Sequence, residues 1–178
     1  QGEGLGNQFL SHIRSTNAIV HVVRAFADPN VQHVDQQHDP KKDIEVINTE
    51  LILADLQTLQ KRLPKFEKEA RANPKLAPIA TTYKQIETAL NEGKLVSSLE
   101  VDPEHIEDLH LITAKPVIYV FNVDEDGLSD TQKVSDLMAL VAPAASIFVS
   151  AKLESELRGL YAADAQELLE SYGFTEVG

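Results

Sequence analysis

The sequence predicts an α/β domain with a parallel sheet, interrupted by an inserted helical hairpin. Three short apolar runs, at residues 18–26, 116–123 and 145–150, are rich in β-branched residues and typical of buried parallel strands. Helical segments separate the runs, and this order favours crossovers between parallel strands. Between the first two runs, the apolar spacing changes to that of a helical seam.

The inserted segment has the apolar spacing of two long helices. Apolar residues recur at steps of three and four from residue 44 to residue 70, and again from 76 to 90. Asn73-Pro74 begins a short turn between the two stripes, so we expect an antiparallel helical hairpin. Pro64 lies inside the first stripe and predicts a kink or a break of the helix near Leu63.

Shorter elements flank the strands and the hairpin. We expect helices at residues 8–14, 129–141 and 154–172, a short helix starting at Asp102-Pro103, and a loop over residues 27–40. The predicted organisation is therefore a first part of the α/β domain at 1–40, the inserted helical domain at 41–112, and the rest of the α/β domain at 113–178.

Composition narrows the functional class. The 178 residues are 43% hydrophobic, enough for a real core, and contain no cysteine for disulfides or thiolate metal sites. The formal charge of −12 argues against a protein that coats nucleic acid, but residues 41–94 hold 10 basic and 8 acidic residues. No apolar run is long enough to span a membrane. The chain starts without Met, so we expect an internal piece of a longer cytoplasmic protein.

Two strand ends carry the residues of a nucleotide-base site. Asn122-Val123-Asp124-Glu125 and Ser150-Ala151-Lys152 follow the second and third strands, where open parallel sheets bind ligands. GTPases carry Asn-Lys-x-Asp and Ser-Ala-Lys at these places. Here Glu125 replaces the guanine-reading Asp, and its extra methylene displaces the carboxylate, while adenine can donate its amino group to backbone carbonyls near Val123. The motif favours adenine over guanine; the alternative is a turn with a helix cap.

The resemblance to one family is carried by long runs of residues. Residues 2–14, 18–26, 43–56, 115–119 and 122–125 resemble the Obg-like ATPases of the YchF family. The resemblance implies a G domain of the P-loop NTPase class, an inserted coiled coil, a C-terminal TGS domain, a preference for ATP over GTP, and association with ribosomes or translation.

The resemblance also implies what this chain does not carry. It has no Gly-x-x-x-x-Gly-Lys-Ser/Thr phosphate loop, and the family's loop and switch segments would precede Gln1. We therefore expect the base-recognition half of a nucleotide site, inactive by itself. ATP or GTP with Mg²⁺ would be bound by the longer protein, with the Mg²⁺ ligands outside this chain.

His33 is the candidate catalytic residue. The resemblance implies that the water-orienting Gln of many GTPases is missing, and a histidine in the loop after the first strand could position water. The alternative is a solvated loop histidine. His21 lies in a strand and is expected to belong to the core, and the spacing of the histidines predicts no metal site.

A basic cluster near the predicted hairpin tip is the candidate partner surface. It consists of Lys61, Arg62, Lys65, Lys68, Arg71 and Lys75. A positive surface on a projecting arm suits contact with RNA phosphates, in particular those of the ribosome. The alternative is a solvated helix face. The competing function is a non-catalytic, monomeric interaction module whose coiled-coil arm docks on RNA or a protein.

Overall fold

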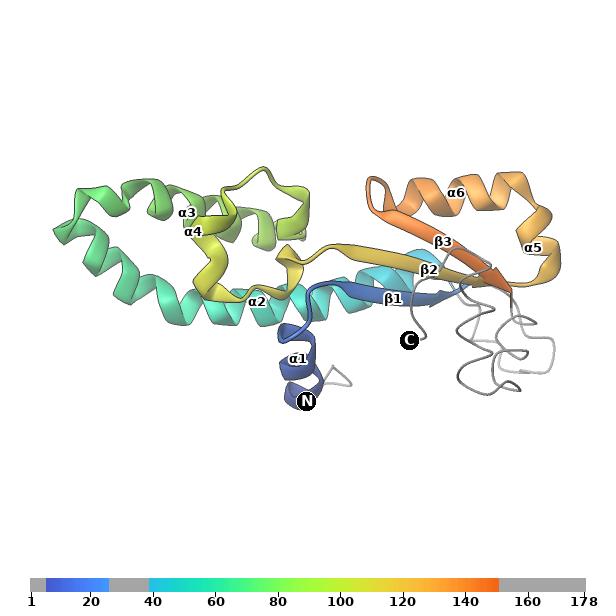
Figure 1. The fold of residues 1–178 in the computed structure, drawn as a ribbon, viewed down its shortest axis with the longest axis horizontal. Coiled ribbons are helices and arrows are strands. Elements are labelled where there is room, and N and C mark those ends of the chain that lie inside the picture. Colours follow the sequence, from blue (N-terminus) through green and yellow to red (C-terminus); the bar gives the residue numbers. More distant parts are fainter. Residues whose placement is uncertain (1–5, 26–38, 151–178) are drawn as a thin grey trace. The chain divides into compact units, whose positions relative to one another are not determined.

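The computed structural model describes residues 6–25 and 39–150. Its helices and strands are α1 (Asn7–Arg14), β1 (Ile19–Arg24), α2 (Pro40–Ala72), α3 (Ala77–Asn91), α4 (Pro103–Ile106), β2 (Val117–Val123), α5 (Glu125–Ser129), α6 (Thr131–Val141) and β3 (Ala145–Ser150) (Figure 1). Four short 3₁₀ helices complete the order: η1 (Pro74–Leu76), η2 (Val96–Ser98), η3 (Glu107–Leu109) and η4 (Ile112–Ala114). The chain divides into a helical unit, residues 1–19 and 41–117, and a sheet unit, residues 20–40 and 118–178.

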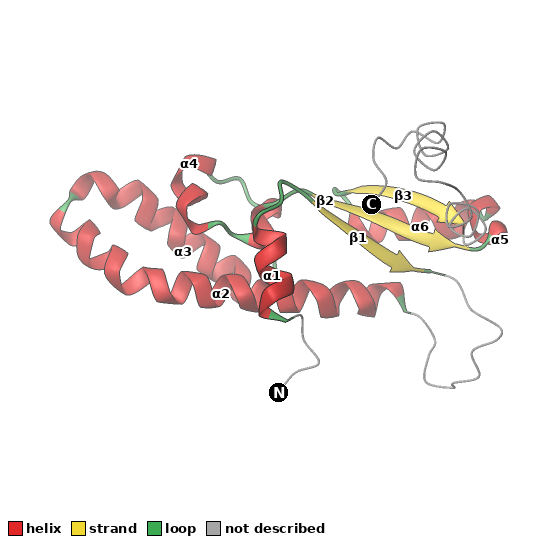
Figure 2. Ribbon diagram, turned by 60° about the horizontal axis from the view of Figure 1, so that its bottom comes forward, coloured by secondary structure: helices red, strands yellow, loops and turns green. Residues whose placement is uncertain are grey.

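The sheet unit is built on three strands in the order β1-β2-β3. β2 and β3 are parallel, with Ile118 opposite Ala145 and Val123 opposite Ser150. The backbone of β1 follows β2 in the same direction, because the Ile19 amide donates to the Pro116 carbonyl at 2.9 Å and the Ala25 amide donates to the Asn122 carbonyl at 2.8 Å. Figure 2 shows the three arrows pointing the same way. The predicted α/β fold with a parallel sheet is therefore confirmed.

The core of the sheet unit comes from near-continuous apolar strands. Phe121 and Val123 are fully buried, and the rings of Phe121 and Phe148 stack across β2 and β3 with centroids 5.3 Å apart. His21 is half-buried, and its ring lies 5.4 Å from that of Tyr119. Burial on both faces explains why the run of β2 does not alternate with polar residues. β1 differs from the buried strand that was predicted, because Val20 and Val22 are 60% and 65% exposed while Val23 is buried.

The helical unit is an antiparallel hairpin of α2 and α3, joined through η1 (Figure 1). Its core combines both predicted stripes: Leu59, Phe66, Tyr83, Ile86 and Leu90 are all buried. Gly93 ends the hairpin at a φ of 78°, and the amide of Lys94 then donates to the Ala89 carbonyl at 2.9 Å. Such a left-handed position after a helix favours glycine.

Of the two outcomes predicted at Pro64, a kink or a break of the helix near Leu63, the break does not occur. α2 runs from Pro40 to Ala72 with Pro64 inside it, and Figure 1 shows it bending rather than ending. Pro64 removes one backbone hydrogen bond of the helix. Leu59 and Phe66, buried on either side of it, hold both halves in the same core, so packing outweighs the local preference of proline.

The helix predicted at 129–141 is α6, which begins two residues later than predicted, at Thr131, and the short helix α5 before it was not predicted. α5 ends at Ser129, and Asp130 then caps α6 by accepting a hydrogen bond from the Lys133 amide at 3.1 Å. An aspartate at this position competes with helix continuation because its side chain replaces the missing backbone acceptor. The helix expected at 154–172 lies outside the described residues. No helix in the described ranges has the length and apolar character to cross a membrane.

Candidate nucleotide-base site and basic groove

The two predicted base-binding motifs begin at the same edge of the sheet. The register pairs Val123 with Ser150, the last residues of β2 and β3. Asn122 and Ser150 are both buried, at 8% exposure each. The carboxyl ends of the two parallel strands thus lie at one level of the sheet, which is the edge where ligands of open α/β sheets bind.

Within the first motif, the two carboxylates have different roles. Asp124 caps α5, since its Oδ1 accepts a hydrogen bond from the Gly127 amide at 2.6 Å. Glu125 is the first residue of α5 and is exposed. Asp124 therefore acts as a helix cap, as the alternative interpretation of the motif expects. Glu125 takes no part in this cap and is exposed beside the end of β2.

Gly127 is required by this tight turn. A Cβ atom built there would lie 2.8 Å from Asp124 Oδ1 and 3.1 Å from the Cβ of Val123. The close approach keeps the capping carboxylate against the backbone. Val123 itself is fully buried, so its side chain cannot cover a base as a lysine stem does. At Val123, only the backbone could contact a nucleotide base.

Three of the predicted site residues lie outside the described part of the chain. They are the catalytic candidate His33 and the base-site residues Ala151 and Lys152. In the described ranges, no group of three or more His, Asp or Glu side chains is arranged to hold a metal ion.

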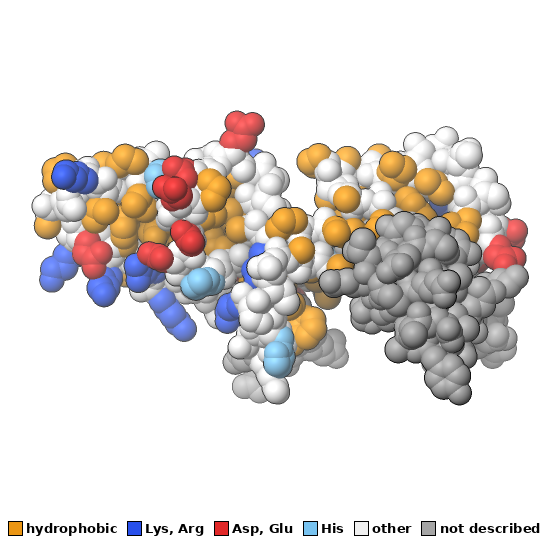
Figure 3. Space-filling model, viewed as in Figure 1, with side chains coloured by type: hydrophobic (Ala, Val, Ile, Leu, Met, Phe, Trp, Pro, Cys, Tyr) orange, Lys and Arg blue, Asp and Glu red, His pale blue; other side chains and the backbone are white. Residues whose placement is uncertain are grey.

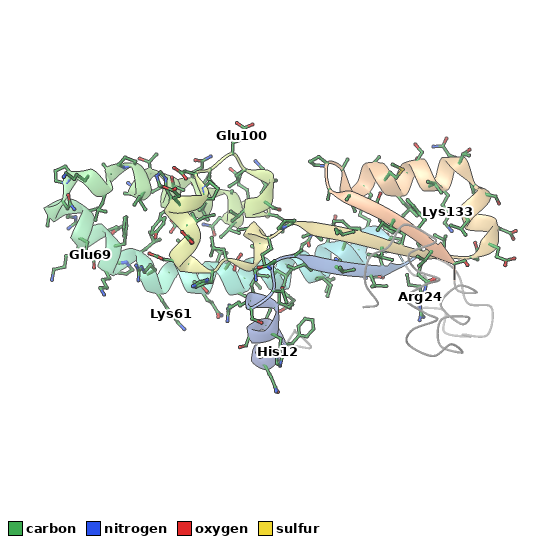
Figure 4. The ribbon with its side chains drawn as sticks, in the orientation of Figure 1. His12, Arg24, Lys61, Glu69, Glu100 and Lys133 are labelled. Carbon is green, nitrogen blue, oxygen red and sulfur yellow. The ribbon has the colours of Figure 1, made fainter. Side chains whose placement is uncertain are left out.

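The six predicted basic residues fall into two groups along the arm. Lys61, Arg62 and Lys65 line a groove of about 650 Å³ together with Arg14 of α1 and Asp108 of η3. The remaining three, Lys68, Arg71 and Lys75, follow toward the turn at η1 and do not line it. Figure 3 shows Lys and Arg side chains gathered along one edge of the hairpin, and in Figure 4 Lys61 projects away from α3.

Arg62 lies near the phenol of Tyr83 at the wall of the groove. Tyr83 is a side chain of α3 that is 3% exposed and packs against Phe66 at a centroid distance of 4.5 Å. Burial raises the pKa of Tyr83, and the nearby Arg62 guanidinium opposes that rise. The phenol therefore stays protonated at neutral pH.

A buried polar junction beside the groove was not predicted from the sequence. Asp55 of α2 is 1% exposed, and its two carboxylate oxygens accept hydrogen bonds from the amides of Ile112 at 2.9 Å and Thr113 at 2.8 Å. Burial raises the pKa of Asp55, while the hydrogen bonds from Thr113 and Ile112 and the charge of Arg14 act against the rise. The sequence did carry a signal of this junction, because Asp55 lies within the apolar stripe of α2, three residues after Ile52 and four before Leu59.

Lys115 completes the junction at the end of α1. Its Nζ donates to the carbonyls of Ile13 and Arg14, each at 2.7 Å, and of Thr16 at 2.5 Å. The Ile13 carbonyl also accepts from the amide of Thr16 at 3.1 Å and from its hydroxyl at 2.7 Å, and a lysine at this helix end complements the helix dipole. Desolvation lowers the pKa of Lys115, and the negative charge of Asp55 opposes this.

The parallel sheet, with the two motifs beginning at its carboxyl edge, is that of the nucleotide-binding α/β domain of a P-loop NTPase. In this chain a helical hairpin interrupts the domain. Comparison with known proteins is specific. Over the whole chain, the sequence is 42% identical to the ribosome-binding ATPase YchF of Bacillus subtilis strain 168 and 37% identical to that of Escherichia coli O157:H7. The chain belongs to the YchF family.

The solved structures agree with this assignment. The structure of the Schizosaccharomyces pombe YchF GTPase matches 99% of this chain and 51% of its own length, with a TM-score of 0.72 and 28% sequence identity. The chain likewise spans 51% of each of the two bacterial relatives, about half of their length. No protein-family model matches the chain.

Proposed function

We propose that this chain supplies the base-binding side of a nucleotide site in a ribosome-associated ATPase or GTPase, with ATP preferred. The observation that carries the proposal is the register of Val123 with Ser150, which puts the ends of β2 and β3, where the two motifs begin, at one edge of the sheet. The relatives support it, since their names describe ribosome-binding ATPases and a GTPase.

Recognition of the base would rest on few groups of the described chain. Glu125 is exposed at the strand end, Asn122 is buried near the end of β2, and the Val123 backbone would accept from an adenine amino group. A guanine ring presents two donors that an aspartate at position 125 would bind as a pair. The longer glutamate moves the carboxylate away from that position, so selectivity for guanine is weakened.

The groups that bind the phosphates and Mg²⁺ and carry out hydrolysis would not be among these base contacts. Phosphate binding, Mg²⁺ and hydrolysis require a phosphate loop, and this sequence contains no such motif. Residues 1–178 are therefore expected to be inactive alone, and His33 remains the predicted water-positioning residue of the whole protein. The inserted hairpin at 41–112 is proposed as a separate interaction module, monomeric and carried by the α/β domain.

Substitution of Glu125 tests the base assignment. The test uses a protein of the full length of the relatives that contains this segment. In it, Glu125→Asp should shift the ratio of ATP to GTP affinity, measured by calorimetry, toward GTP. Asp126→Asn, one residue further along α5, is the matched control and should leave the ratio unchanged. If the ratio is the same in wild type and Glu125→Asp, position 125 does not read the base.

A further inference from the structure

We propose that Lys133 of α6 is a positioning residue of the nucleotide-base site, whose ammonium group holds the turn from Asp124 to Gly127 that places Glu125 at the end of β2. This inference rests on the proposed function, and it adds to the same site a residue that neither strand-end motif contains. Lys133 and the turn both belong to the sheet unit.

The side chain of Lys133 reaches from α6 back to the turn that opens α5. A Cβ atom built on Gly127 would lie 3.7 Å from Lys133 Nζ and 2.8 Å from Asp124 Oδ1. The ammonium group and the carboxylate therefore face the same point of the turn, because Gly127 has no side chain to separate them. In Figure 4, Lys133 extends from α6 toward the strands of the sheet.

Both ends of this contact are fixed by helix caps. The amide of Lys133 donates to Asp130 Oδ1 at 3.1 Å, which fixes where the lysine side chain starts. The amide of Gly127 donates to Asp124 Oδ1 at 2.6 Å, which closes the turn at the other end. Lys133 thus connects the capped start of α6 with the capped start of α5.

Lys133 is the only cation in its part of the sequence. From residue 116 to residue 151 there is one lysine, no arginine and five carboxylates, three of them in succession at 124–126. Like charges at this spacing repel one another, and an ammonium group beside them lowers that repulsion. The turn is therefore the place in this stretch where a cation has the largest effect.

The ammonium group is not consumed by a close ion pair. Across residues 6–25 and 39–150, no carboxylate oxygen forms a salt bridge with Lys133 Nζ, although Lys133 is half-buried. A half-buried charge is screened less by water than an exposed one, so its interactions extend further. Lys133 therefore acts on the carboxylates of the turn together, and most strongly on Asp124.

Glu125 depends on this turn because it lies inside it. The bond between Gly127 and Asp124 spans Glu125, so the backbone of Glu125 moves when that bond opens. Without the ammonium group the turn is looser, and the Glu125 carboxylate then also reaches positions that can accept the paired donors of guanine. Lys133 thus supports the preference for ATP through Glu125, without itself touching the nucleotide.

The test removes the charge of Lys133 and keeps most of its apolar stem. It uses a protein of the full length of the relatives that contains this segment, with ATP and GTP affinities measured by calorimetry. In Lys133→Met the ratio of ATP to GTP affinity should fall by about threefold or more, and Lys133→Arg should stay within about twofold of wild type because it keeps the charge.

Gln132→Met is the matched control. Gln132 precedes Lys133 on α6, is exposed, and donates from its side chain to Asp136 at 2.8 Å rather than toward the turn. The ratio of ATP to GTP affinity in Gln132→Met should equal that of wild type.

A double-mutant cycle separates positioning from a purely structural role. Glu125→Gln removes the carboxylate charge through which Lys133 is proposed to act. In that background, Lys133→Met should change the ratio by less than about twofold. Amide hydrogen exchange at Gly127 is a readout that needs no nucleotide, and it should become faster in Lys133→Met while exchange at Val141, at the far end of α6, stays the same.

Several results would overturn the inference. An unchanged ratio in Lys133→Met, with normal nucleotide binding, would show that the lysine only stabilises the helices. The same fall in the Glu125→Gln background would show that the effect does not pass through Glu125, and unchanged exchange at Gly127 would show that the turn does not need the charge. Absence of nucleotide binding by wild type would refute the proposed function and this inference with it, and that failure is distinct from the others because they leave wild-type binding intact.

Discussion

Replacement of Asp55 by alanine is the most direct perturbation of the helical unit. The wild-type carboxylate accepts hydrogen bonds from two buried amides, those of Ile112 and Thr113, and is itself 1% exposed. Asp55→Ala leaves both donors buried without an acceptor. Each such group costs about 1–3 kcal/mol. Relief of the buried charge offsets part of this, so we expect a net loss of about 3 kcal/mol in the free energy of unfolding.

Urea unfolding followed by circular dichroism measures this loss. Asp55→Asn keeps one acceptor but turns its amide toward the second donor, so its loss should be smaller, about 1–3 kcal/mol. Glu67→Ala is the control, because Glu67 is an exposed carboxylate of the same helix and its loss should stay within about 0.5 kcal/mol. A loss below about 1 kcal/mol for Asp55→Ala would show that water or a rearranged segment replaces the carboxylate, and the reasoning would be refuted.

The pH dependence has a defined sign. Burial raises the pKa of Asp55 in the folded protein above its ordinary value of 3.8. A raised pKa of an acid means that the folded state binds more protons than the unfolded state above that value. The stability of wild type relative to Asp55→Asn should therefore be greatest below about pH 4 and should fall as pH rises through the folded pKa. The opposite slope would show that the hydrogen bonds outweigh desolvation.

Two further predictions concern the same unit. Lys115→Met removes the donor to three carbonyls at the end of α1 and should destabilise the protein by about 1–2 kcal/mol, with faster amide exchange in α1 than in α3; unchanged exchange in α1 would contradict the cap. Pro64→Ala restores a helix hydrogen bond within α2 and should raise the free energy of unfolding by about 1 kcal/mol or more, and a decrease would show that the packing of the arm depends on the bend.

The parts of the fold that periodicity controls could be predicted from the sequence. The apolar runs of β2 and β3 and the two stripes of the hairpin gave the correct elements because burial on one or both faces leaves a repeat. The continuity of α2 through Pro64 could not be predicted, since it depends on contacts of Leu59 and Phe66 with another helix. Local preference and tertiary packing compete there, and only the structure shows which is stronger.

The candidate sites show the same limit. The strand-end motifs were visible because each is a run of adjacent residues, although the sequence did not show that Asp124 rather than Glu125 caps the helix. The groove was visible only in part. Lys61 and Lys65 belong to a local cluster, but Arg14 and Asp108 are brought to it from distant parts of the chain. Residues that meet only through the fold leave no spacing in the sequence.

The groove and the buried junction share one residue, and this links their chemistry. Arg14 lines the groove through its side chain, lowers the pKa of Asp55 through its charge, and gives its carbonyl to Lys115. The two hydrogen bonds of Asp55 and the bonds of Lys115 therefore connect α1, α2 and the segment at 112–115 within the helical unit. Loss of the Arg14 charge should act on Asp55 even though Arg14 makes none of those side-chain bonds, because its effect on the carboxylate is electrostatic.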